Sequence, residues 1–215
     1  MEQAKKTINL ANVANVQDAV QLNIVLDCAK LRAWQAAEGT IQPAYATVLA
    51  YARKKLRENY RTWNEEELKM HFISPILSVA NTNIPNVCKT FFERPLHGII
   101  NNYEMDVITD CMVALPKLSG DPDKPYFFLQ EFKQSQRFGR TDPEGQMLAA
   151  MLLAQQSNAD DKYLYGCFVI EKNWHFTTLK GLDYCVSPQF DATKKEDLIK
   201  IVYMLCQLKE LILNR

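Results

Sequence analysis

The nine residues FFLQEFKQS, at positions 127–135, place a carboxylate and an ammonium group in a segment that otherwise resembles a buried strand. Side chains alternate along a strand, so one face is expected to carry Phe127, Leu129, Glu131 and Lys133. Both faces are largely apolar, as in a central strand that is covered on both sides. Glu131 and Lys133 would lie about 6.6 Å apart. Because burying a bare charge costs several kcal/mol, each charge needs a partner: the other one, a metal ion or another acid.

The composition is that of an ordinary globular protein. The chain has 215 residues, 47% of them hydrophobic, and a formal net charge of zero. A strongly basic surface is excluded, so any nucleic-acid binding must come from a local patch of charge. The N-terminus has no signal-peptide pattern, and the longest apolar run, from Met147 to Ala154, is far short of the ~20 residues of a membrane helix. We therefore expect a cytoplasmic protein that does not bind membranes.

The six cysteines do not form a metal-binding pattern. No two of them have the C-x-x-C spacing that is common in zinc sites. Most lie in apolar stretches, where a thiol behaves as a small hydrophobic group. We expect reduced cysteines in the core and no zinc.

Hydrophobic periodicity predicts an α/β protein. Helices are expected at about 15–38, 43–60, 64–80, 142–157 and 193–213, and strands at 87–96, 103–115, 124–135, 162–170 and 173–179. From about residue 62 the order is α-β-β-β-α-β-β-α, which predicts a mixed central sheet flanked by helices. We assign residues 62–215 to this domain and residues 1–61 to a helical N-terminal extension packed on it.

The helix that follows Asn64 carries a carboxylate on its apolar side. Asn64 and Glu67 have the spacing of a capping box. At 100° per residue, Leu68, Phe72 and Ile76 share one face, and Glu65 falls in the middle of that face. A carboxylate that points toward the core needs a partner.

Asp106 is the candidate partner for Glu131. It begins an apolar strand segment 25 residues before Glu131, as two neighbouring strands joined by a loop would allow. Two carboxylates at adjacent strand ends make an oxygen site suited to Mg²⁺ or Mn²⁺. Asp110 is expected about 13 Å from Asp106, too far to share one ion. These residues alone leave a second interpretation equally open, in which Glu131 pairs with Lys133 and Asp106 caps a turn.

The order of the motifs from about 62 to 212 resembles the PD-(D/E)XK nuclease superfamily, which has the restriction-endonuclease-like fold. It is most similar to the N-terminal nuclease domain of type I restriction motor subunits. The resemblance is carried by NEEELKMHFISPIL (64–77), YEMDVI (103–108), FFLQEFKQS (127–135), EGQMLAAMLLAQQ (144–156) and YLYGCFVIEKNWHFTTLKG (163–181). Met105 stands where the motif name has proline, and Ala150 stands where the family often has tyrosine. The first 60 residues lie outside the resemblance.

The resemblance implies a role for five residues. Asp106 and Glu131 would bind Mg²⁺ or Mn²⁺, and Lys133 would position and activate the attacking water. Glu65 matches the acid of the family's opening helix. Gln146 matches a glutamine that contacts substrate or supports the lysine.

Three functions follow as hypotheses. The first is a magnesium-dependent nuclease, a hydrolase that cleaves DNA in preference to RNA in restriction, defence or DNA processing. Its sequence specificity would come from a partner subunit, and a dimer is plausible. The second is a catalytically silent nuclease-like fold that binds nucleic acid or protein. The third is a metal-dependent hydrolase of a small phosphate ester.

Basic side chains outside the motif distinguish these hypotheses. The stretch 43–61 is the most basic of the chain, with Arg53, Lys54, Lys55, Arg57 and Arg61. It is either a solvated helix face or a ridge that faces phosphates. Arg137 and Arg140, with Lys117 and Lys124, lie in loops that flank the expected site.

Overall fold

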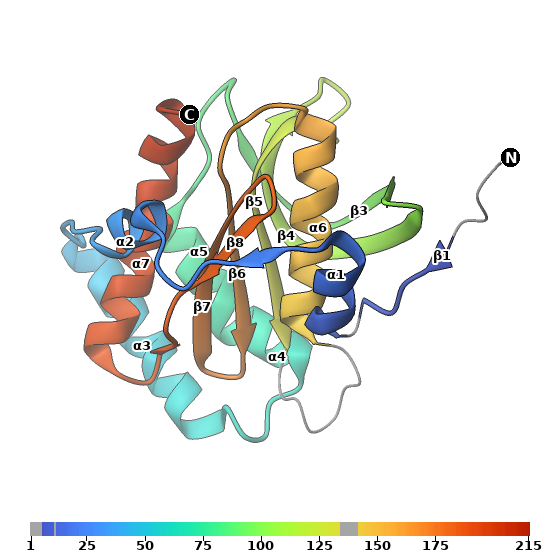
Figure 1. The fold of residues 1–215 in the computed structure, drawn as a ribbon. Helices are drawn as coiled ribbons and strands as arrows, with labels where there is room; N and C mark the ends of the chain where they lie inside the picture. Colours follow the sequence, from blue (N-terminus) through green and yellow to red (C-terminus); the bar gives the residue numbers. More distant parts are fainter. Residues whose placement is uncertain (1–5, 11, 134–141) are drawn as a thin grey trace, which may run out of the picture.

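A mixed β-sheet lies between two layers of helices in the computed structural model, which describes residues 6–10, 12–133 and 142–215 (Figure 1). One layer contains α1 (Val13–Val20) and α6 (Pro143–Asn158). The other layer contains α2 (Ala29–Gln35), α3 (Pro43–Asn59), α5 (Ser74–Ala80) and α7 (Lys195–Leu213). The predicted α/β class, with a mixed sheet flanked by helices, is confirmed.

The longer strands of the sheet pair antiparallel except for two that α6 connects, which pair parallel. Its longer strands are β3 (Lys89–Ile100), β4 (Tyr103–Pro116), β5 (Pro122–Lys133), β6 (Leu164–Ile170) and β7 (Asn173–Lys180). Strands β3, β4 and β5 pair antiparallel, β6 pairs parallel to β5, and β7 returns antiparallel to β6. A parallel pair needs a long connection, and α6 supplies it. The predicted order of these elements is confirmed.

Helix α6 is buried over most of its length, up to Ala154, as its sequence predicts. The Asp142 side chain accepts a hydrogen bond from the Glu144 N–H, and Pro143 occupies the first turn. Residues Met147 to Ala154 are all buried against the sheet. Although α6 is so apolar, no helix in the described part of the chain combines the length and hydropathy needed to cross a membrane.

The N-terminal region differs from its prediction. The single helix expected at about 15–38 is wrong: α1 ends where Gln21 takes a left-handed conformation with φ of 58°, and the two-residue strand β2 (Asn23–Ile24) separates it from α2. Strand β2 pairs with β8 (Asp183–Val186), and β1 (Lys6–Thr7) pairs with β4. The division at residue 61 stays a prediction.

Irregular pairing shifts the register between β4 and β5. Leu115 pairs with Asp123, but Ala114 pairs with Tyr126 and Val113 with Phe128. Within this irregular stretch, the residues of β5 that have no partner in β4 are Lys124, Pro125 and Phe127. The prediction that Phe127 shares a face with Leu129 is therefore wrong, since Phe127 packs with Phe128 in the core under α7. Beyond the irregularity the register is regular to the pair of Cys111 and Gln130.

The helical run after Asn64 contains a π-helical turn. It comprises α4 (Glu65–Leu68), the π turn η1 (Lys69–Ile73) and α5. The capping box of Asn64 and Glu67 is present as predicted. Pro75 has no N–H and its ring crowds the preceding turn, so the helix widens before it. Figure 1 shows α4 beside the end of the sheet where β5 and β6 finish.

Candidate active site

Glu131 and Asp110 meet across neighbouring strands at the end of the β4–β5 ladder. One step beyond the pair of Cys111 and Gln130, the register brings Asp110 opposite Glu131. There a side chain replaces the backbone acceptor of the ladder: Asp110 Oδ2 accepts a hydrogen bond of 2.6 Å from the Phe132 N–H. Glu131 is only 1% exposed, and among the described residues its Oε1 has no hydrogen-bond partner. A buried carboxylate oxygen without a donor is costly, which marks it as a place where a ligand could bind.

Lys133, two residues along β5, is held by the opening helix. Its Nζ lies 3.3 Å and 3.2 Å from the two carboxylate oxygens of Glu65. The predicted partner for Glu65 therefore exists, and it is the lysine of the E-x-K sequence. Lys133 is mostly buried, so its ammonium group has a fixed direction rather than a free end in solvent.

Lys69 completes the group of charges, which we call the charge cluster: Glu65, Lys69, Asp110, Glu131 and Lys133. The Lys69 Nζ lies 2.8 Å from Asp110 Oδ1 and 3.1 Å from Glu65 Oε1. It also lies 3.2 Å from a Glu93 oxygen and 3.5 Å from a Glu66 oxygen. An ammonium group thus sits among four carboxylates.

Burial and neighbouring charge alter the acid–base properties of the cluster. Burial, and then the negative charge of Asp110, raise the pKa of Glu131 well above that of an ordinary glutamic acid, although the nearby Lys133 opposes the shift. Burial lowers the pKa of Lys69, but its hydrogen bonds and charge interactions with Asp110 and Glu65 outweigh this effect and raise it overall. Glu131 therefore keeps its proton to a higher pH than an ordinary glutamic acid, and Lys69 keeps its charge to a higher pH than an ordinary lysine.

Asp106 does not join this cluster. It pairs in register with His97 of β3, and its side chain is 75% exposed. Its Oδ1 lies 2.6 Å from His97 Nδ1. Since four residues of strand span about 13 Å, the expectation that Asp106 and Glu131 lie close enough to share one metal ion is wrong, and Asp110 is the aspartate that lies beside Glu131. The irregular β4–β5 register is the reason.

Gln146 lies near the start of α6, and its buried Oε1 has no hydrogen-bond partner within the described part of the chain. By alternation Glu131 lies on the same face of β5 as Leu129, which packs in the core that α6 helps to form. The structure thus brings Gln146 to the correct layer, but no contact of its side chain with the charge cluster is described. Its role in substrate contact stays a prediction.

The acids of the cluster are too few to enclose a metal ion by themselves. Within the described ranges, no three histidine, cysteine, aspartate or glutamate side chains are placed to hold one together. Asp110 and Glu131 form an oxygen pair, while Glu65 is engaged by Lys133 and Lys69. An ion at this place would therefore have two carboxylate ligands and would need water or substrate oxygens for the others.

Beside the charge cluster lies a group of residues that we call the cationic rim: Arg61 and Lys172, with the Tyr60 ring that both of them contact. The Lys172 Nζ and the Arg61 guanidinium lie 5.4 Å and 5.5 Å from the centre of the Tyr60 ring. The turn that carries Lys172 contacts the end of β5, because the Glu171 N–H donates to the Lys133 carbonyl over 2.8 Å. Arg137 and Arg140, also expected to flank the site, lie outside the described residues.

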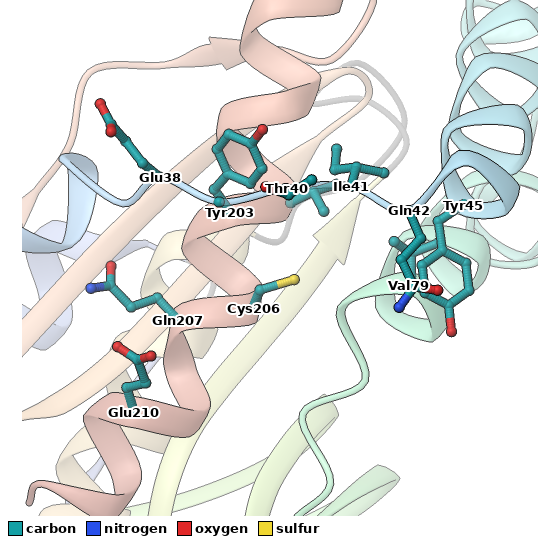
Figure 2. Close-up of a pocket in the computed structure, with 12 residues that line it drawn as sticks. Glu38, Thr40, Ile41, Gln42, Tyr45, Val79, Tyr203, Cys206, Gln207 and Glu210 are labelled. Carbon is teal, nitrogen blue, oxygen red and sulfur yellow. The ribbon is translucent and has the colours of Figure 1, made fainter.

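A pocket elsewhere in the molecule has a different chemical character. It lies between the segment 38–45, Val79 and α7, and has a volume of about 250 Å³ (Figure 2). Tyr203, Cys206, Gln207 and Glu210 of α7 line one side of it. Its lining residues include two glutamates and no lysine or arginine. The pocket is therefore unsuited to a phosphate ligand.

Sequence reasoning missed Asp110 and Lys69 as members of the site. Lys69 follows Glu65 by four residues, a spacing that pairs opposite charges on a helix, and this signal could have been used. Asp110 was excluded by its distance from Asp106, whereas its distance from Glu131 is the one that matters. No family model matches the chain, and no curated protein matches it either.

Proposed function

We propose that the chain is a metal-dependent nuclease of the PD-(D/E)XK type, which hydrolyses phosphodiester bonds of nucleic acid, with DNA as the first substrate to test. The observation that supports this most strongly is the buried Oε1 of Glu131, which has no hydrogen-bond partner and lies beside Asp110. Lys133 follows on the same strand, and Glu65 faces it from the opening helix. The order of strands and helices agrees with the restriction-endonuclease-like fold.

The donor atoms fit Mg²⁺ or Mn²⁺. Both ions prefer oxygen ligands, and Mg²⁺ is commonly held by one or two carboxylates together with water and substrate phosphate. Asp110 and Glu131 would hold it here, and the unpartnered Glu131 oxygen is the atom that gains most from a cation. When bound, the ion would polarise the scissile phosphate and make a bound water more acidic.

Lys133 supplies a fixed positive charge beside these acids. Because both oxygens of Glu65 accept its hydrogen bonds, the ammonium group is oriented before substrate arrives. A preoriented cation stabilises the negative charge that develops on a phosphate in the transition state. Glu65 is then a positioning residue that acts through Lys133.

A polymeric phosphate fits the surroundings better than a small phosphate ester. The cationic rim adds Arg61 and Lys172 beside the end of β5, and Lys172 also pairs with Asp191 over 2.7 Å. Helix α3 packs against η1, and its Arg53, Lys54 and Arg57, together with Glu58, line an open hollow of about 510 Å³. Several phosphates in a row would use these separate cations, whereas a single one would not.

The test combines calorimetry with a cleavage assay on mixed-sequence DNA in Mg²⁺ or Mn²⁺. Asp110→Ala should abolish saturable Mn²⁺ binding, with Asp106→Ala as the matched control that retains it. Lys133→Ala should fold and lose cleavage by about 100-fold or more, the scale on which one charge-stabilising donor acts. Lys162→Ala, an exposed lysine before β6 at the opposite end of the sheet, should cleave normally. A Lys133→Ala protein that cleaves at the wild-type rate would contradict the proposal.

A second function, a silent nuclease-like binding module, is favoured by one observation. Lys69 already neutralises Asp110 and Glu65, so the cluster is partly balanced without a metal ion. In that case wild-type protein binds no Mn²⁺ and cleaves nothing, yet it still binds DNA through α3 and the cationic rim. Removal of Glu131 alone would then lower stability, since Lys133 would lose a nearby counter-charge.

A further inference from the structure

We propose that Lys69 is an internal counter-ion that holds Asp110 when no divalent cation is present and releases it when one binds. Lys69 would thereby set the metal affinity of the site. The inference rests on the proposed metal site of Asp110 and Glu131 and adds a residue that the E-x-K sequence does not include.

The two oxygens of Asp110 are both engaged. Oδ2 accepts the Phe132 N–H, which fixes the carboxylate to the end of β5. Oδ1 accepts the Lys69 ammonium at 2.8 Å, the shortest contact that Lys69 makes. Each carboxylate oxygen keeps a second lone pair, so a cation can still bind Asp110, but it would then share this carboxylate with the Lys69 ammonium. Two positive charges held by one carboxylate repel each other strongly in a partly buried place.

The surroundings give Lys69 an alternative position. Glu66 and Glu93 also contact its Nζ, at 3.5 Å and 3.2 Å, and their side chains are far more exposed than that of Asp110. A lysine has four rotatable bonds, so its ammonium group can leave Asp110 and keep these two acceptors. Lys133 differs, because its ion pair is with Glu65 and not with Asp110.

The experiment is a Mn²⁺ titration by calorimetry on the full chain, with thermal unfolding in the presence of EDTA. We expect Lys69→Met to bind Mn²⁺ about tenfold or more tightly than wild type, because a competing charge has been removed while the aliphatic stem is kept. The same variant should melt at a lower temperature without metal, because four carboxylates lose their shared cation. Lys54→Met, an exposed lysine of α3, is the matched control and should change neither value.

The outcomes separate this inference from the proposed function. Tighter Mn²⁺ binding together with a lower metal-free melting temperature supports the counter-ion role, whether or not DNA is cleaved. Equal or weaker binding by Lys69→Met, with saturable binding by wild type, overturns the role and leaves the metal site intact. Absence of binding in both proteins overturns the inference and the metal site together.

A second variant, Lys69→Arg, tests the inference if Lys69→Met does not fold. Lys69→Arg keeps the positive charge and presents a planar fork that grips a carboxylate with two hydrogen bonds. It should therefore bind Mn²⁺ more weakly than wild type. Unchanged or tighter binding by Lys69→Arg would contradict competition at Asp110.

Discussion

Asp106 and Asp110 lie on the same strand, on the same side of the chain by alternation, and have opposite environments. Asp106 is 75% exposed and contacts one histidine, whereas Asp110 is 7% exposed and contacts a lysine and a backbone N–H. Their strand positions make both plausible metal ligands. The comparison shows that the neighbouring strand decides between them, since only Asp110 lies opposite Glu131.

The largest difference should appear in stability. Asp110→Ala leaves the mostly buried Lys69 without its nearest partner and removes the acceptor of the Phe132 N–H. Loss of one member of a buried ion pair costs on the order of 3–5 kcal/mol. Asp106→Ala should cost less than about 1 kcal/mol, as exposed pairs do. Urea unfolding of the two variants measures both losses of stability. Equal losses would show that the two aspartates do not differ in their contribution to folding.

A smaller effect is expected in the pH dependence of stability. The pKa of Glu131 is raised on folding, so the folded protein binds this proton more tightly than the unfolded chain. Stability should therefore fall as the pH rises from about the ordinary glutamic acid value of 4.5 through the folded pKa. Glu131→Gln removes this loss. At alkaline pH it should be more stable than wild type by about 1 kcal/mol or more, the usual cost of an unsatisfied buried polar group.

The measurement is urea unfolding of wild type and of Glu131→Gln, without divalent metal, between pH 5 and pH 9. Because the amide of the variant does not titrate, the difference between the two curves isolates Glu131. Parallel curves would show that Glu131 does not titrate differently in the folded protein, and the contrast between Asp106 and Asp110 would then lose its electrostatic basis.

The smallest effect concerns His97. Its contact with Asp106 is on the surface, where ion pairs contribute about 0–1 kcal/mol. His97→Ala should therefore change the free energy of unfolding by less than about 1 kcal/mol and leave Mn²⁺ affinity unchanged. Calorimetry on this variant measures the Mn²⁺ affinity. A lowered affinity would contradict the separation of Asp106 from the charge cluster.

The sequence predicted the elements of the site better than their register. Periodicity and capping residues located α6 and the hairpin of β6 and β7, because those signals are local. The partner of Glu131 depends on pairing across a loop. Continued without interruption, the pairing of Leu115 with Asp123 would bring Val107, next to Asp106, opposite Glu131. The unpaired residues of β5 move that position to Asp110. The local sign of such an irregularity is Pro125, which cannot donate to a ladder, but it does not show how far the register shifts.

The N-terminal region was harder to predict because its elements also depend on residues that are distant in the sequence. Its two-residue strands, β1 and β2, are defined by pairing with β4 and β8, which lie far away in the sequence. Trp34 is likewise buried in the core, where its Nε1–H donates a hydrogen bond to the Met204 carbonyl, 170 residues later. Apolar residues at helical spacing predicted burial correctly, but they could not show where the helix is interrupted.

The π turn at Lys69–Ile73 has a genetic consequence. A π turn is an α-helix with one residue inserted, and each residue of an α-helix turns the chain by about 100°. Loss of one codon, for example that of the exposed Met70, would let the turn rewind as α-helix. Glu65 would then rotate away from Lys133, and the buried Leu68 would rotate with it, while Ile76 kept its place in the core. A single-codon change would thus alter the ion pair of this helix and the packing of its first turn together.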